Sequence, residues 1–173
     1  MSRKLVLFFS VYGSTKRIAE EIARQTGADL KEIEPIIPYD AEQNHYDALA
    51  RQAKRELDEN QRPGINGQIP ISAYDMIFLG YPVWWYSLPM ILRTLFDEDD
   101  FSGKLILPFN THMGSRDSGT WQMIRELAPK AFVGEGLTIE MPDVERSVEK
   151  AVTKWLDRLP QDKRLEQTIS QSA

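Results

Sequence analysis

The chain has 173 residues and none of them is cysteine. Disulfide bonds, iron–sulfur clusters held by thiolates and dithiol redox catalysis are therefore excluded. If this protein transfers electrons, an organic cofactor has to carry them.

A long apolar run is also missing near the start. Only five apolar residues, Leu5 to Phe9, stand between the opening Met-Ser-Arg-Lys and Ser10. A signal peptide needs an apolar stretch of roughly 7–15 residues, and a transmembrane helix needs about 20. We therefore expect a cytoplasmic protein with no membrane partner.

Positive charge is in the minority, since 21 Lys and Arg residues face 26 Asp and Glu residues and leave a net charge of −5. A mildly acidic chain without a basic run binds nucleic acid poorly, so we expect no such partner. Hydrophobic residues (42%) and charged residues (27%) occur in the proportions of a globular protein with a real core. We predict one domain over residues 1–160 and a polar C-terminal tail at 161–173. The oligomeric state is left open.

Several motifs of α/β enzymes are absent. There is no G-x-x-x-x-G-K-[ST] for a nucleotide triphosphatase, and no G-x-G-x-x-G after the first strand for a dinucleotide. His112 lies close to Ser115, Asp117 and Ser118, but such near neighbours in sequence seldom form a triad, and no G-x-S-x-G elbow is present. We assign no catalytic side chain and no metal ligand.

What the sequence does contain is a regular alternation of strand and helix patterns. Short apolar runs predict buried strands at 4–9, 29–33, 76–80, 105–109 and 132–139, the last interrupted by Gly134. Helical patterns end at Gly27, cover 46–57, begin near Ser87, and cover 117–128 and 144–159. This order predicts an α/β fold in which helices cover both faces of a parallel sheet. Ligands of such sheets bind outside the carboxyl ends of the strands.

The loop after the first strand leads directly into a helix and is rich in hydroxyl groups. Its residues are Ser10, Val11, Tyr12, Gly13, Ser14 and Thr15. Unpaired N–H groups at a helix N-terminus hold phosphate well, and a glycine lets the backbone turn close to the anion. Ser and Thr are also ordinary helix caps, so phosphate binding and simple capping are equally good explanations of this loop alone.

The loop after the third strand is aromatic, although no core periodicity demands aromatic residues there. It contains Pro82, Val83, Trp84, Trp85 and Tyr86. Large planar side chains are what a flat, partly apolar ligand needs. We expect one tryptophan to fill the core and the other to meet the ligand.

The loop after the fourth strand is short and polar. Its candidate ligand contacts are Thr111, His112, Gly114 and Ser115. Such residues offer backbone N–H and C=O groups to the edge of a heteroaromatic ring. A phosphate loop, an aromatic loop and a polar loop together describe a mononucleotide with a large planar head.

Three segments resemble the flavodoxin family, in particular its short-chain bacterial branch. They are LVLFFSVYGSTKRIAEEIA, YDMIFLGYPVWWYSLPMIL and LILPFNTHMGS, and the likeness covers about residues 4–157. The resemblance implies a doubly wound, five-stranded parallel sheet of order 2-1-3-4-5 in three α/β/α layers, with one FMN. Phosphate contacts are implied for Ser10, Tyr12, Gly13, Ser14 and Thr15, ring contacts for residues 82–86, and edge contacts for Thr111, His112, Gly114 and Ser115.

Two departures from the family pattern lie in the predicted ligand loops. Tyr86 stands where related chains often have glycine, which turns its backbone more easily. His112 and Met113 precede a single Gly114, where many relatives have two glycines.

The expected function is electron transfer by bound FMN, with a redox protein as partner. The alternative is an FMN-dependent NAD(P)H:quinone oxidoreductase, and a third reading is a binding module that has lost the flavin. In the first two, the protein binds and orients the cofactor, and the flavin supplies the chemistry.

Overall fold

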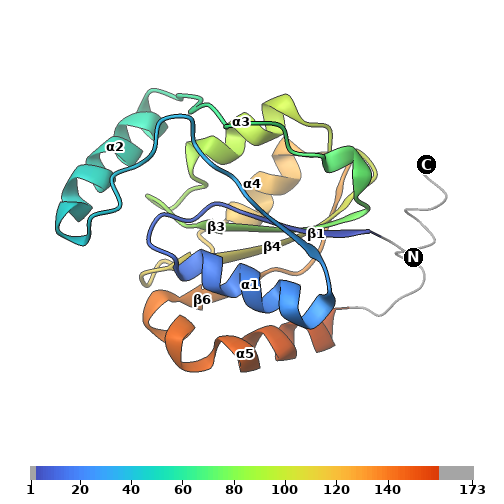
Figure 1. Cartoon of the computed structure of the whole chain (residues 1–173). Helices are drawn as coiled ribbons and strands as arrows, with labels where there is room; N and C mark the ends of the chain where they lie inside the picture. Colours follow the sequence, from blue (N-terminus) through green and yellow to red (C-terminus); the bar gives the residue numbers. More distant parts are fainter. Residues whose placement is uncertain (1–2, 160–173) are drawn as a thin grey trace.

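The computed structural model describes residues 3–159 and shows an α/β fold in which one sheet lies between two layers of helices (Figure 1). The strands are β1 (Lys4–Phe8), β2 (Asp29–Glu32), β3 (Met76–Pro82), β4 (Leu105–His112), β5 (Phe132–Val133) and β6 (Leu137–Glu140). All pairings are parallel, in the order β2-β1-β3-β4-β5, and β6 also pairs with β4. The predicted strand order is confirmed. The predicted tail at 161–173 lies outside the described residues.

The predicted fifth strand is split into β5 and β6, and the break begins at Gly134, where the sequence predicted an interruption. A Cβ on Gly134 would lie 2.6 Å from Leu107 Cδ2, and one on Gly136 would lie 2.4 Å from the Trp121 ring. At both positions the absence of a Cβ therefore leaves room for these neighbouring side chains. β4 pairs with β5 before this break and with β6 after it.

The helices cover both faces of the sheet, as the alternation predicts. They are α1 (Ser14–Thr26), α2 (Tyr46–Asp58), α3 (Met90–Glu98), α4 (Thr120–Leu127) and α5 (Met141–Arg158), with short 3₁₀ turns at Gln43–His45 and Ile71–Ala73. In Figure 1, α1 and α5 lie below the sheet and α3 and α4 above it, while α2 stands at the left end. Each face has its own apolar core, one including Ile91 of α3 and the other including Ile18 of α1 and Trp155 of α5.

Several predicted boundaries are wrong, and local turns or strand pairing explain three of them. α3 begins at Met90 and not near Ser87, because Ser87 is paired with Trp84 in a tight turn. β4 continues to His112 because β6 extends the ladder. α4 begins at Thr120, after a turn in which the Thr120 N–H donates to Asp117 O, and α5 begins at Met141, ahead of the expected 144.

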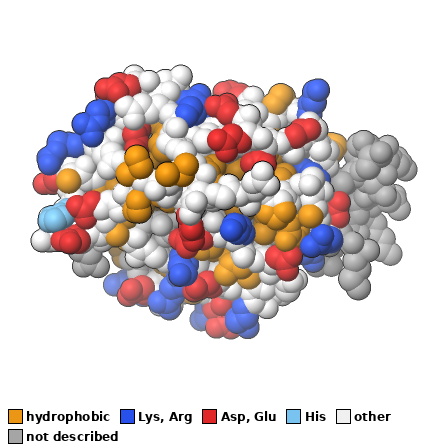
Figure 2. Space-filling model, turned by 45° about the horizontal axis from the view of Figure 1, so that its top comes forward, with side chains coloured by type: hydrophobic (Ala, Val, Ile, Leu, Met, Phe, Trp, Pro, Cys, Tyr) orange, Lys and Arg blue, Asp and Glu red, His pale blue; other side chains and the backbone are white. Residues whose placement is uncertain are grey.

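No helix within residues 3–159 is long and apolar enough to cross a bilayer. On the face seen in Figure 2, acidic and basic side chains alternate and hydrophobic ones reach the surface in patches between them.

Candidate functional site

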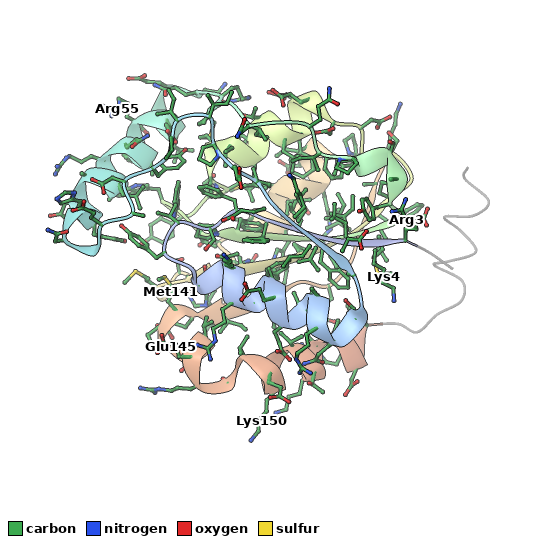
Figure 3. The ribbon with its side chains drawn as sticks, in the orientation of Figure 1. Arg3, Lys4, Arg55, Met141, Glu145 and Lys150 are labelled. Carbon is green, nitrogen blue, oxygen red and sulfur yellow. The ribbon has the colours of Figure 1, made fainter. Side chains whose placement is uncertain are left out.

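The three predicted loops meet at one end of the sheet. Figure 3 marks this end by Met141 at the start of α5, while Lys4 at the start of β1 marks the opposite end. Because the strands are parallel, the residues that follow β1, β3 and β4 emerge together beside Met141. The fold thus places the phosphate, aromatic and polar loops around a common space.

The first loop leaves the N-terminus of α1 open. Ser10 Oγ accepts a hydrogen bond from the Gly13 N–H at 3.1 Å, which closes the loop on itself. Gly13 has φ +95°, and a Cβ there would meet nothing within 4 Å. α1 has no side-chain cap and no acidic residue in its first turn, so its leading N–H groups suit an anion.

Thr15 and Thr111 are brought together and away from solvent. Their hydroxyl oxygens lie 2.8 Å apart, and both residues are almost completely buried. Both were predicted as ligand contacts, and in the structure their hydroxyls share one hydrogen bond in which either can be the donor. The pair pins the first loop to the end of β4.

Tyr12 has a buried hydroxyl with no hydrogen-bond partner among the described residues. Burial, together with the neighbouring Tyr46 and Asp40, raises the pKa of Tyr12, so the phenol keeps its proton at neutral pH. Its ring lies 6.3 Å from that of Tyr46 at 31°. A buried donor without a partner is expected where a ligand binds.

The second loop contains a strained turn. Trp84 and Ser87 exchange two backbone hydrogen bonds, of 3.1 and 3.0 Å. Trp85 and Tyr86 between them have φ +51° and +58°, the left-handed pattern of a type I′ turn. Glycine and asparagine normally fill such positions, and bulky residues there cost about 1–2 kcal/mol each. Related chains often have glycine at position 86, and a positive φ was expected to be costly for tyrosine there. Tyr86 nevertheless has a positive φ.

The two tryptophans have different surroundings, as predicted. Trp84 packs edge-on against Phe9 (5.3 Å, 82°) and Tyr39 (5.3 Å, 76°) and joins the core. Trp85 is 45% exposed. Its indole Nε1–H donates to Ala50 O at 2.9 Å. Tyr86 is more exposed than Trp85, at 71%.

Tyr39 supports Trp84 from the core side and was not predicted as part of the site. Its hydroxyl donates to Glu56 Oε2 at 2.7 Å, and both residues are buried. Burial and the Glu56 carboxylate raise the pKa of Tyr39, so this phenol stays protonated. Tyr39 could not be identified as a site residue from the sequence, because the neighbouring Pro38 makes this segment resemble a loop.

The third loop begins as strand, because β4 continues through Thr111 and His112. The Val83 N–H donates to Thr111 O at 2.8 Å, and the Gly114 N–H donates to His112 Nδ1 at 3.0 Å. Burial lowers the pKa of His112, so the ring is neutral and carries its proton on Nε2. Gly114 has φ +100°, which only glycine adopts easily. Ser115 accepts a hydrogen bond from Ser118 through its carbonyl.

Tyr46 and Met113 complete the rim and were not among the predicted site residues. The helical period puts Tyr46 on the apolar face with Leu49 and Ala53, and those two are buried. Tyr46 itself is 49% exposed, and its hydroxyl donates to Met113 Sδ at 3.7 Å. An uncapped helix N-terminus, exposed aromatic groups and a buried unpaired donor therefore lie together at this end of the sheet, which suits a phosphorylated ligand with a flat head.

The chain is similar in sequence and fold to several known proteins. The family model for Flavodoxin matches residues 3–159. A flavoprotein from Bacteroides eggerthii superposes with a TM-score of 0.80 at 30% identity, covering 94% of this chain and 100% of that chain. A flavoprotein from Lactobacillus acidophilus, solved in complex with FMN, superposes with a TM-score of 0.69 at 24% identity and covers 84% of this chain and 98% of that chain.

An NAD(P)H dehydrogenase (quinone) from Gluconacetobacter diazotrophicus is 25% identical over 152 residues, which span 79% of this chain and 71% of that protein. The family model covers almost all the described residues and includes all three loops of the site. The chain therefore belongs to the flavodoxin family.

Proposed function

We propose that this protein binds one FMN non-covalently at the carboxyl end of its sheet and transfers electrons through it. The observation that carries the proposal is the uncapped, acid-free N-terminus of α1 beside an exposed aromatic turn. The flavodoxin family and the FMN held by the Lactobacillus acidophilus flavoprotein support the same cofactor.

The residues present fit FMN. Its phosphate suits the leading N–H groups of α1 and the Ser14 hydroxyl, with the open space at Gly13 for close approach. The flat ring suits the space between Tyr86 and the third loop, and the unpaired Tyr12 hydroxyl supplies a further donor. Only one anion site of this kind follows β1, which favours FMN over FAD.

Bound FMN supplies the redox chemistry, because it accepts and gives up one or two electrons. The chain's own contribution is binding, orientation and exclusion of water. Phe9, Tyr39 and Trp84 form a dry aromatic layer beneath the site. Neutral His112 keeps a donor proton on Nε2 at the end of β4. None of these roles needs a side chain that gains or loses a proton during turnover.

The second candidate function is reduction of a quinone by NAD(P)H. The relative from Gluconacetobacter diazotrophicus favours it, since that protein is an NAD(P)H dehydrogenase (quinone). An electron carrier meets a partner protein, whereas this enzyme admits two small molecules in turn. Oxidation of NAD(P)H by the FMN-loaded protein, with and without a quinone, separates the two. Steady NAD(P)H consumption that depends on the quinone supports the enzyme, and its absence supports the carrier.

The cofactor itself is tested by releasing the bound pigment with acid and identifying it by chromatography. FMN is the expected product. FAD, or the failure of the apoprotein to take up any flavin, would overturn the proposal.

A further inference from the structure

Helix α2 touches all three loops of the site, although it belongs to none of them. The Tyr46 ring lies 6.3 Å from Tyr12 of the first loop. The Trp85 indole of the second loop donates to Ala50 O, and the Tyr46 hydroxyl donates to Met113 Sδ of the third loop at 3.7 Å. Figure 1 shows why this is possible, since α2 stands at the end of the sheet where the loops emerge.

The body of α2 is packed more firmly than its first turn. Leu49, Ala53 and Glu56 are buried, so the body of α2 is anchored in the core. Tyr46 lies ahead of them and is about half exposed, and Met113 is 67% exposed. The contact between these two side chains joins the first turn of α2 to the third loop, and solvent reaches both of them.

The segment leading into α2 is closed by its own local contacts. His45 Nδ1 lies 2.6 Å from Asp40 Oδ2, and the Glu42 N–H donates to Asp40 Oδ1. These contacts hold residues 40–45 together directly ahead of Tyr46, so this segment and Tyr46 can move as one unit. Opening this unit breaks the contact with Met113 without disturbing the buried part of α2.

We propose that Tyr46 and Met113 form a latch across the site, and that FMN enters and leaves when this latch opens. The inference rests on the proposed function, because it assumes that FMN binds between the three loops. A single exposed hydrogen bond from a phenol to a thioether sulfur is weak enough to break spontaneously. Its loss changes an opening equilibrium by about two- to tenfold.

A latch has a kinetic signature that an ordinary ligand contact lacks. Loss of a ligand contact raises the dissociation rate and leaves the association rate unchanged. Loss of a latch that closes over the empty and the filled site alike raises both rates together, because the open state becomes more populated in both. The dissociation constant then changes little.

The test is stopped-flow mixing of the apoprotein with FMN, followed by flavin fluorescence, for wild type, Met113→Ala, Tyr46→Ala and Tyr46→Phe. Both rate constants are expected to rise about two- to tenfold in the two alanine variants. Tyr46→Phe removes only the hydroxyl that donates to Met113 Sδ, so its rate constants are expected to rise about as much as those of Met113→Ala. Ile37→Ala is the control, because Ile37 is an equally apolar residue ahead of α2 and is 79% exposed. Unchanged association rates in both alanine variants would overturn the latch.

Hydrogen exchange of the apoprotein tests the latch without any flavin. Amides of residues 40–47 are expected to exchange faster in Met113→Ala than in wild type, while those of residues 49–57 keep their protection. Equal exchange of the 40–47 amides in both proteins would overturn the latch. If wild type fails to bind FMN at all, the proposed function fails, and the exchange result still decides whether the two side chains hold this segment.

Discussion

Replacing Tyr86 with glycine is expected to give a more stable protein than replacing it with alanine. Both changes remove the same side chain, which is 71% exposed and so contributes little burial. They differ in the Cβ atom alone, and Tyr86 has φ +58°. The comparison therefore isolates the backbone strain in the turn between Trp84 and Ser87.

The expected size follows from two opposing terms. A Cβ in the left-handed region costs about 1–2 kcal/mol. Glycine makes the unfolded chain more flexible, which costs about 0.4–1 kcal/mol relative to alanine. The difference favours glycine by about 1 kcal/mol, which for a domain of this size is a rise in Tm of about 2–4 °C.

The assay is urea unfolding of the two apoprotein variants under the same conditions, with calorimetry for Tm. Position 37 provides the matched control, because Ile37 is also highly exposed and is not among the residues with positive φ. There, alanine is expected to be the more stable substitution. If glycine is also the less stable choice at position 86, the turn is not strained and the account of it is wrong.

Three further predictions concern buried groups near the site. Thr15→Val is expected to cost about 1–3 kcal/mol in urea unfolding, because it leaves the Thr111 hydroxyl buried alone; the double variant with Thr111→Val should cost less than the sum of the two single changes, and full additivity would contradict the pairing. Gly80→Ala would place a Cβ 2.1 Å from the buried ring of Phe109, so it is expected to cost about 1–3 kcal/mol and to be partly rescued by Phe109→Leu. Burial lowers the pKa of His112 in the folded state, so protonation favours unfolding and stability is lost as the pH falls below the ordinary histidine value. His112→Asn should show a shallower loss between pH 7 and 5.5, and parallel pH curves for the two proteins would contradict this reading.

The strands, helices and layers followed from the sequence because they depend on local patterns, whereas the strand order was implied by the family resemblance. Apolar runs such as 76–80 and the helical stripe of 46–57 identify their elements without knowledge of the rest of the chain. The three loops were found for the same reason, since a loop after a buried strand must lie at the carboxyl edge.

What the sequence hides is pairing across the chain. Thr15 and Thr111 are 96 residues apart, and nothing in either loop indicates that their hydroxyls bond each other. Tyr46 has the spacing of a core residue, yet the first turn of α2 projects past the core and meets Met113. The left-handed turn at Trp85 is equally hidden, because neither residue in it is one that such turns prefer.

FMN binding at the N-terminus of α1 is tested by titrating the apoprotein with FMN and with riboflavin and following flavin fluorescence. One FMN is expected to bind per chain, and riboflavin, which lacks the phosphate, is expected to bind much more weakly. Ser14→Ala should weaken FMN and leave riboflavin unchanged, because Ser14 opens α1 at the proposed phosphate site. Equal affinity for the two ligands, or no binding of FMN, would contradict the account.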